Sequence, residues 1–299
     1  MIDENKAFPA DFIAEGVDQT RGWFYTLHAI ATMTKGSVAY KNVVSNGLVL
    51  DKAGQKMSKR LGNAVDPFKT IKKQGPHATT RYMISNPQPW DNIKFDLAGI
   101  EEVTRKFFGT LFNTYSFFAL YANLDRFHYE EKNLSKETKE IDLWILSRLN
   151  SLSRSVEESY NDYEPTKAAR LIQSFVIDEL SNWYVRLCRK RFWKGEMNDD
   201  KKAAYETLFV CLQKVSILMS PIAPFYSDLL YTDLSAKKES VHLADYPLFR
   251  QELIDEDLEY KMGLAQKISS LILSLRTVSY THLRAHETRG NLVCRLLLE

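Results

Sequence analysis

Residues 47–67 read GLVLDKAGQKMSKRLGNAVDP, and this stretch decides how the first third of the chain folds. Its apolar, β-branched opening predicts a buried strand. A loop bracketed by Gly54 and Gly62 follows, and Asp66 and Pro67 are the residue types that cap and open a helix. This order is typical of an open α/β sheet, which binds its ligands beyond the carboxyl ends of its strands.

The residues before this stretch have the same organisation. Residues 11–14 predict a short buried strand that ends at Glu15 and Gly16. Apolar residues spaced three and four apart predict a helix over 21–34. Residues 43–50, broken by Asn46-Gly47, predict the next strand. Two loops, one after each strand, are therefore expected at the ligand-binding edge of the sheet.

From residue 100 onward the pattern becomes helical. Apolar residues recur at helical spacing in segments 100–124, 141–160, 166–193 and 202–219, and a further helix is expected within 255–275. Helices of this number and length pack as a bundle. The expected fold is an α/β portion of Rossmann type followed by an all-α bundle.

The composition of the 299 residues excludes several classes of protein. Hydrophobic residues make up 44% and charged residues 26%, a balance typical of folded domains. Lys and Arg number 40 against 38 Asp and Glu, so the net charge of +2 says nothing about nucleic acid, and any basic surface has to be local. No DNA partner is expected. No apolar run approaches the ~20 residues that cross a membrane. The three cysteines are too far apart for a zinc knuckle or a disulfide framework, which favours a reducing, cytoplasmic setting.

The lysine-rich loop carries the first candidate site. Lys56 and Lys59 are separated only by Met57 and Ser58, on a loop that follows a strand. Ammonium groups at the carboxyl edge of a sheet suit a polyphosphate, whose charge redistributes during transfer. A solvated basic loop is the ordinary alternative for two lysines at this spacing.

A second candidate site lies where the first strand meets its helix. Glu15, Asp18 and Gln19 place two carboxylates and an amide at this corner, a set that can bind an ammonium group and ribose hydroxyls. Capping of the following helix by Asp18 is the ordinary alternative.

A third candidate site is a basic, aromatic-rich helix end within residues 180–194. Its cations are Arg186, Arg189, Lys190, Arg191 and Lys194. They either complement the dipole of the helix or form a stripe that meets RNA phosphates.

These three stretches resemble one family. KMSKR at 56–60 resembles the second signature of the class I aminoacyl-tRNA synthetases, and its flanks, together with FPADFIAEGVDQTRGWF at 8–24, are similar to the isoleucine-specific branch. Trp23 after Arg-Gly favours this branch over the valine-specific alternative. Residues 180–194 and 220–226 look like the anticodon-binding helical domain of the family.

The resemblance implies a fold and a reaction. The fold is an α/β portion of a class I Rossmann-type catalytic domain followed by an all-α anticodon-binding bundle. The reaction is activation of isoleucine by ATP, with Mg²⁺, and transfer to tRNA(Ile), by a cytoplasmic and monomeric enzyme without protein-bound zinc. The implied catalytic and ATP-binding residues are Lys56, Met57, Ser58 and Lys59. The implied aminoacyl-adenylate contacts are Glu15, Gly16, Asp18 and Gln19, and the implied tRNA contacts are the five cations of the third site.

The expected domains are 1–99 for the catalytic part, 100–140 for a connecting region, 141–276 for the bundle and 277–299 for a tail outside the family pattern. The first class I signature, His-Ile-Gly-His, is absent from the sequence. We therefore expect a fragment of a longer synthetase that forms no adenylate by itself, and a tRNA-binding fragment without catalysis is the alternative function.

The sequence departs from the family pattern directly after the lysine-rich loop. Within residues 75–82, His77 stands where the family commonly has Asp, Thr80 where it has Arg, and Arg81 where it has Trp. These departures put the support of the loop in question.

Overall fold

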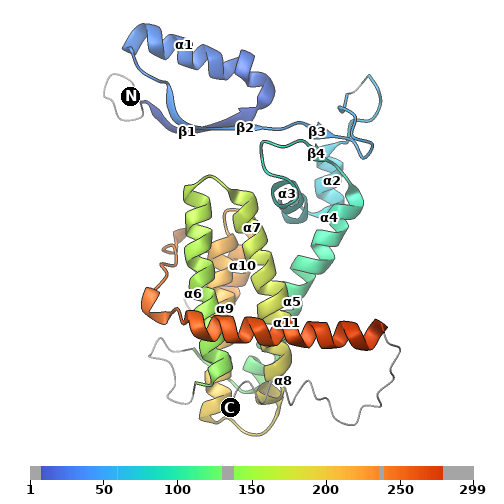
Figure 1. Ribbon diagram of the computed structural model, residues 1–299, viewed down its shortest axis with the longest axis vertical. Coiled ribbons are helices and arrows are strands. Elements are labelled where there is room, and N and C mark those ends of the chain that lie inside the picture. Colours follow the sequence, from blue (N-terminus) through green and yellow to red (C-terminus); the bar gives the residue numbers. More distant parts are fainter. Residues whose placement is uncertain (1–7, 59, 130–137, 236–238, 279–299) are drawn as a thin grey trace.

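The computed structural model of the chain describes residues 8–58, 60–129, 138–235 and 239–278. Figure 1 shows a small α/β unit at one end, a middle region of short helices, and a helical bundle at the other end. No helix in these ranges combines the length and apolar character needed to cross a membrane.

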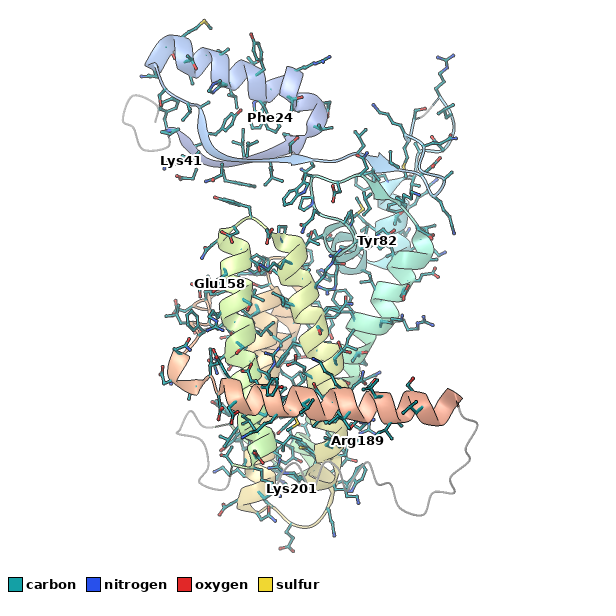
Figure 2. All side chains as sticks on the ribbon, in the orientation of Figure 1. Phe24, Lys41, Tyr82, Glu158, Arg189 and Lys201 are labelled. Atoms are coloured by element: carbon teal, nitrogen blue, oxygen red, sulfur yellow. The ribbon has the colours of Figure 1, made fainter. Side chains whose placement is uncertain are left out.

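The α/β unit consists of two parallel strands and one helix. Strand β1 (Ala10–Gly16) leads through a 3₁₀ turn (Val17–Arg21) into α1 (Trp23–Lys35), and β2 (Tyr40–Asn46) follows. The two strands pair in parallel, so their carboxyl ends lie together. Helix α1 covers one face of the strands and buries Phe24 against them (Figure 2). The strand and the helix expected over residues 11–34 are thus present, but the expectation of a buried strand is wrong, because only Ile13 of β1 is buried and Phe12 is exposed.

The strand expected over residues 43–50 is interrupted. β2 ends at Asn46, and β3 (Val49–Leu50) pairs in parallel with β4 (Ile93–Lys94) in a second two-stranded sheet. Gly47 marks the break, because a Cβ there would lie 2.2 Å from the carbonyl oxygen of Asp91. The close approach of the two backbones therefore requires glycine at this position.

Two short helices separate β3 from β4. They are α2 (Pro67–Gln74) and α3 (Pro76–Ser85). The expected start of α2 is confirmed: the side chain of Asp66 accepts hydrogen bonds from the backbone N–H groups of Phe68 and Lys69, at 2.9 and 3.3 Å, and Pro67 is the first helical residue.

One long helical rod connects the middle region to the bundle. It comprises α4 (Leu97–Val103), a π-helical turn (Thr104–Phe108) and α5 (Gly109–Leu124). The rod corresponds to the helix expected over 100–124. Its inner face buries Phe107 and Leu111 in the bundle core.

The remaining helices form the bundle shown in the lower half of Figure 1. They are α6 (Glu140–Asn161), α7 (Pro165–Ser174) continued by a π-helical segment (Phe175–Val185) and α8 (Arg186–Trp193), α9 (Asp199–Met219), α10 (Pro224–Leu234) and α11 (Glu256–Val278). Short 3₁₀ turns at Val241–Leu243 and Gln251–Leu253 lie between α10 and α11. A single apolar cluster, which includes the fully buried Leu208, Leu212 and Val215, runs through the bundle. The four long helices expected from the sequence are confirmed, whereas α3 and α10 were not expected.

Candidate functional site

The acid–amide corner lies at the carboxyl end of β1. Gln19 Oε1 accepts a hydrogen bond from the backbone N–H of Trp23 at 2.9 Å, and Gln19 Nε2 donates to Asp18 Oδ2 at 3.3 Å. A Cβ on Gly16 would lie 2.6 Å from Asp18 Oδ1, so the Asp18 carboxylate folds back over Gly16. Gln19 therefore caps α1 rather than Asp18, and the structure brings Gly16, Asp18 and Gln19 together. Glu15 is exposed beside them.

The lysine-rich loop begins at the end of β3. Lys56 is exposed, and its backbone forms an antiparallel bridge with Leu50. Met57 and Ser58 are half-buried. Lys59 lies outside the described residues, so its expected contact with ATP stays a prediction. The exposure of Lys56 leaves its ammonium group accessible to a ligand.

The two candidate sites follow strands of two different sheets, β1 and β3, which are linked through β2. The last residue of β1, Gly16, lies opposite Asn46 in the register of the first sheet. From Asn46 the chain continues through Gly47 into β3 and then into the loop. Both sites therefore follow the carboxyl ends of parallel strands, where α/β sheets bind their ligands.

Two residues that were not expected in the site hold the loop. Asn63 Nδ2 donates to Asp51 Oδ2 at 2.8 Å, and Asn63 Oδ1 accepts from the backbone N–H of Ser58 at 2.9 Å. Asp51 Oδ1 also accepts from the backbone N–H of Gln55 at 2.8 Å. The pKa of Asp51 lies below its usual value, chiefly because Asn63 donates to its carboxylate. The available signal in the sequence was an acid directly before the loop and an amide directly after it.

The basic helix end divides into exposed and buried cations. Arg186, Arg189, Lys190 and Lys194 are exposed along α8 and at its C-cap, and Figure 2 labels Arg189 there. In contrast, the Arg191 side chain is 11% exposed and forms an ion pair of 2.7 Å with the fully buried Asp142. Asp142 raises the pKa of the Arg191 guanidinium still further above its usual value, against the effect of burial. Arg191 ties α8 to α6, so its placement counts against the expected contact with RNA, which stays a prediction for the other four.

Two of the three residues that depart from the family pattern, His77 and Arg81, lie on α3 and contact the bundle. Arg81 is 1% exposed, and its Nη2 donates to Ala169 O at 2.8 Å and to Gln173 Oε1 at 3.1 Å. Its guanidinium carbon lies 3.7 Å from the centroid of the Phe107 ring. Burial lowers the pKa of Arg81 to about 10.

The second departure, His77, lies one helical turn earlier. Its Nε2 accepts a hydrogen bond from the backbone N–H of Tyr226 at 3.1 Å, and burial lowers its pKa. The third departure, Thr80, is exposed. His77 and Arg81 therefore join α3 to α10 and α7 rather than support the lysine-rich loop.

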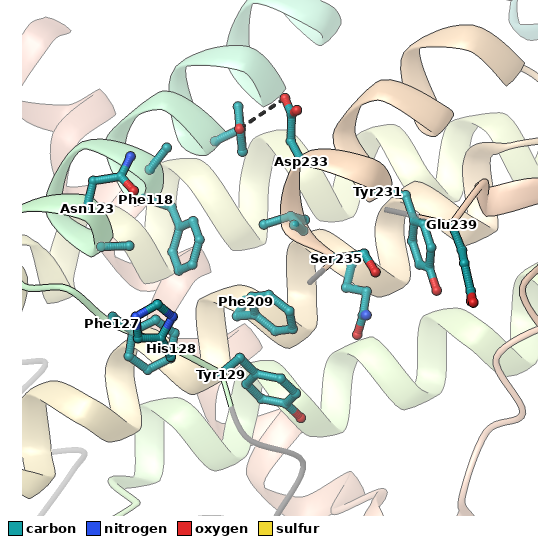
Figure 3. A pocket seen from close by; sticks show the side chains of 15 residues that line it. Phe118, Asn123, Phe127, His128, Tyr129, Phe209, Tyr231, Asp233, Ser235 and Glu239 are labelled. Atoms are coloured by element: carbon teal, nitrogen blue, oxygen red, sulfur yellow. Dashed lines mark hydrogen bonds between the residues drawn. The ribbon is translucent and has the colours of Figure 1, made fainter. Parts of the chain in front are cut away.

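The bundle also contains a cavity of about 660 Å³, shown in Figure 3. Aromatic side chains from α5, α9 and α10 line it, among them Phe118, Phe209 and Tyr231, and Tyr115 donates to Asp233 at its edge. None of the expected site residues lines this cavity. Within the described ranges, no group of three or more His, Cys, Asp or Glu side chains is placed to hold a metal ion.

Comparison with known families matches both halves of the chain. Residues 2–96 match the family described as tRNA synthetases class I (I, L, M and V), and residues 142–285 match the anticodon-binding domain of tRNA ligase. Two solved structures share the fold. One is the LeuRS of Agrobacterium radiobacter in a complex with tRNA and LeuAMS, with a TM-score of 0.67 and 20% identity over 84% of this chain and 30% of that chain. The other is the Mycobacterium tuberculosis methionyl-tRNA synthetase with methionyl-adenylate, with a TM-score of 0.63 and 20% identity over 79% of this chain and 47% of that chain.

Curated relatives are much closer in sequence. The isoleucine–tRNA ligase of Bacteroides thetaiotaomicron is 61% identical over 92% of this chain and 24% of its own length. The ligase of the same name from Thermus thermophilus is 43% identical over 92% of this chain and 27% of its own length. The chain thus spans about a quarter of the relatives that it matches. The chain belongs to the class I tRNA synthetases, and within that family it is similar to the isoleucine–tRNA ligases.

Proposed function

We propose that the chain is the part of an isoleucine–tRNA ligase that carries the lysine-rich loop and the anticodon-binding bundle. The observation that carries the proposal is the exposed Lys56, held at the carboxyl end of a parallel strand in a chain 61% identical to such a ligase. The complete enzyme would activate isoleucine with ATP and transfer it to tRNA(Ile).

The acid–amide corner and the loop have complementary roles in this proposal. The carboxylate of isoleucine attacks the α-phosphorus of ATP, and pyrophosphate leaves. Because the nucleophile is already an anion, the protein contributes positioning and charge stabilisation. Lys56 and Lys59, with Met57 and Ser58, would contact the phosphates, and Mg²⁺ would arrive on the nucleotide as part of the substrate.

The corner would hold the product of this step. Glu15, Gly16, Asp18 and Gln19 would contact the aminoacyl-adenylate, with the carboxylates facing its ammonium group and ribose. Arg186, Arg189, Lys190 and Lys194 would face tRNA phosphates at the end of the bundle. We also propose the boundaries 1–99, 100–140 and 141–276 for the catalytic, connecting and anticodon-binding regions, in a monomeric, cytoplasmic enzyme.

A chimeric ligase tests the proposal. Residues 8–276 would replace their counterpart in the Bacteroides thetaiotaomicron isoleucine–tRNA ligase, and exchange of pyrophosphate with ATP would be measured with isoleucine and with valine. Exchange that depends on isoleucine is expected, and Lys56→Ala should lower its rate by about 10²–10³-fold. Lys52→Ala is the matched control, because this exposed lysine of the same loop instead pairs with Asp96 at 3.4 Å.

The outcomes of this experiment discriminate between the candidate functions. A preference for valine would favour the valine-specific branch. An inactive chimera that still binds tRNA would favour an RNA-binding role, for which the second supporting observation is the group of exposed cations on α8.

A further inference from the structure

The lysine-rich loop starts as a closed turn. The backbone N–H of Asp51 donates to Gln55 O at 2.8 Å, and that of Gly54 donates to Asp51 O at 2.9 Å. Gly54 has a φ of +84°, a left-handed conformation that glycine adopts without strain. Together with the bridge between Leu50 and Lys56, these bonds fix the first half of the loop.

A side chain from the far end of the loop holds its second half. The Asn63 amide reaches the Asp51 carboxylate at 2.8 Å, the Ser58 N–H at 2.9 Å and the Lys56 carbonyl oxygen at 3.3 Å. One amide thus joins the residue before the loop to two members of the KMSKR signature. Asp51 and Asn63 are both half-buried, which strengthens these polar contacts relative to contacts in open water.

The pairing has a fixed polarity. Asn63 Oδ1 must accept the Ser58 N–H, so its NH₂ group faces Asp51. Asp51 uses both carboxylate oxygens as acceptors, one for Gln55 and one for Asn63. Asparagine at position 51 would offer one acceptor oxygen to two donors, so its own NH₂ group would face one of them. Aspartate at position 63 would place a carboxylate opposite the carboxylate of Asp51. Exchanging the two residues, however, would restore a donor opposite an acceptor.

We propose that Asp51 and Asn63 are positioning residues for the reaction: they form a clamp that sets where the loop presents Lys56 and Ser58 to the triphosphate. This inference rests on the proposed function for its catalytic consequence, whereas the clamp itself rests on the contacts above. If the clamp exists, each single substitution should disturb the loop, and exchanging the two residues should restore it. A general loss of stability would not be reversed by the exchange.

Four variants of the 299-residue chain test the clamp: Asp51→Asn, Asn63→Asp, the double exchange, and Lys52→Gln as a control in the same loop. Hydrogen exchange of the Ser58 amide reports the clamp directly. Each single substitution should lower its protection about tenfold or more, because a hydrogen bond to a charged group is lost. The double exchange should return the protection to within about threefold of the starting chain, since only the 3.3 Å contact to Lys56 is not rebuilt.

The pH dependence of Asn63→Asp adds a second signature. Two facing carboxylates share a proton as the pH falls, so protection of Ser58 should recover in acid in this variant and in none of the others. Unchanged protection in the single variants, or a double variant with the sum of both losses, would overturn the clamp.

The same variants in the chimeric ligase test the catalytic consequence. The single substitutions should lower kcat for pyrophosphate exchange about tenfold or more with a smaller change in KM for isoleucine, and the double exchange should recover kcat. If the loop recovers its protection but kcat does not, the clamp is not a positioning device. If the unsubstituted chimera is inactive, the proposed function fails while the exchange measurements still decide the clamp.

Discussion

At the scale of single residues, the fold separates cations that look alike in the sequence. Lys56 and Arg189 remain exposed and available, whereas Arg191 and Arg81 are committed to the interior. Arg191 is neutralised by Asp142, but the described partners of Arg81 are a carbonyl oxygen, an amide oxygen and an aromatic ring. Hydrogen bonds and the π face of Phe107 thus offset part of the cost of burying this charge, and the lowered pKa of Arg81 reflects the part that remains.

The first prediction concerns Arg81. Arg81→Ala should lower the free energy of unfolding of the chain by about 3–4 kcal/mol, because it leaves a cavity and two unsatisfied oxygens. Arg81→Met fills most of the space and should cost less than half as much. Urea unfolding measures both changes, with Arg189→Ala as an exposed control expected within about 0.5 kcal/mol. Equal effects of Arg81→Ala and Arg189→Ala would show that the buried contacts contribute nothing.

At the scale of elements, helices were predictable and their interruptions were not. Spacing located α6 to within one residue at each end, because its apolar face repeats regularly over many turns. The same spacing located α9, which begins at Asp199 and thus three residues before the expected start. Asn46-Gly47 marks the break between β2 and β3 in the sequence, but the backbone of Asp91 that requires glycine there lies forty-odd residues away, and no local pattern reports it. The candidate site divides in the same way. A local string was enough to single out Lys56 as a candidate, but the partner of Arg191 lies on another helix.

Helix α11 offers a prediction at this scale, because it crosses the bundle (Figure 1) and the Glu259 carboxylate holds it in addition to its buried Leu258 and Met262. Glu259 accepts from Arg148 at 2.8 Å and from the hydroxyls of Ser147 and Ser151 at 2.5 and 2.8 Å. Glu259→Ala should reduce the local stability of α11 by about 2 kcal/mol, measured by hydrogen exchange of its first three turns.

The control for this prediction lies two residues away. Asp257 pairs with Lys261 at 2.6 Å, but both side chains are exposed, so Asp257→Ala should change the exchange by less than about 0.5 kcal/mol. Faster exchange throughout the bundle in Glu259→Ala would indicate that α11 is part of the cooperative core and not a separately anchored element.

At the scale of the whole molecule, α3 is the joint between the α/β region and the bundle. Its His77 and Arg81 contact α10 and α7, and the Thr166 hydroxyl of α7 donates to Ile84 O at 2.6 Å. These polar contacts, together with the helical rod of α4 and α5, therefore set the relative position of the loop and the anticodon-binding region. His77 and Arg81 were noticed in the sequence as departures from a family pattern, which gave no indication of what they touch.

The joint should respond to pH through His77. Its neutral Nε2 accepts from Tyr226 N–H at 3.1 Å between the rings of Phe108 and Phe225, and its pKa is lowered in the folded chain. The unfolded state therefore binds a proton more readily, so stability should fall as the pH drops below about 6.5. His77→Gln keeps an acceptor but does not titrate, and urea unfolding from pH 7.5 to 5.5 should show a smaller loss. The same slope in both chains would assign it to other groups.

Binding of tRNA(Ile) should depend on salt through the exposed cations of the bundle. Each phosphate contact releases counterions, so log K should fall linearly with log salt concentration, by about 0.7–0.9 for each contact. Replacing Arg186, Arg189, Lys190 and Lys194 with Gln should therefore reduce this slope by about 3 in filter binding, while the fold is retained because all four side chains are exposed. Replacing Lys69, Lys72 and Lys73 of α2 with Gln removes exposed charge far along the chain from α8 and should leave the slope nearly unchanged. An equal reduction in both variants would mean that tRNA responds to total charge, and that the end of α8 is not its specific docking site.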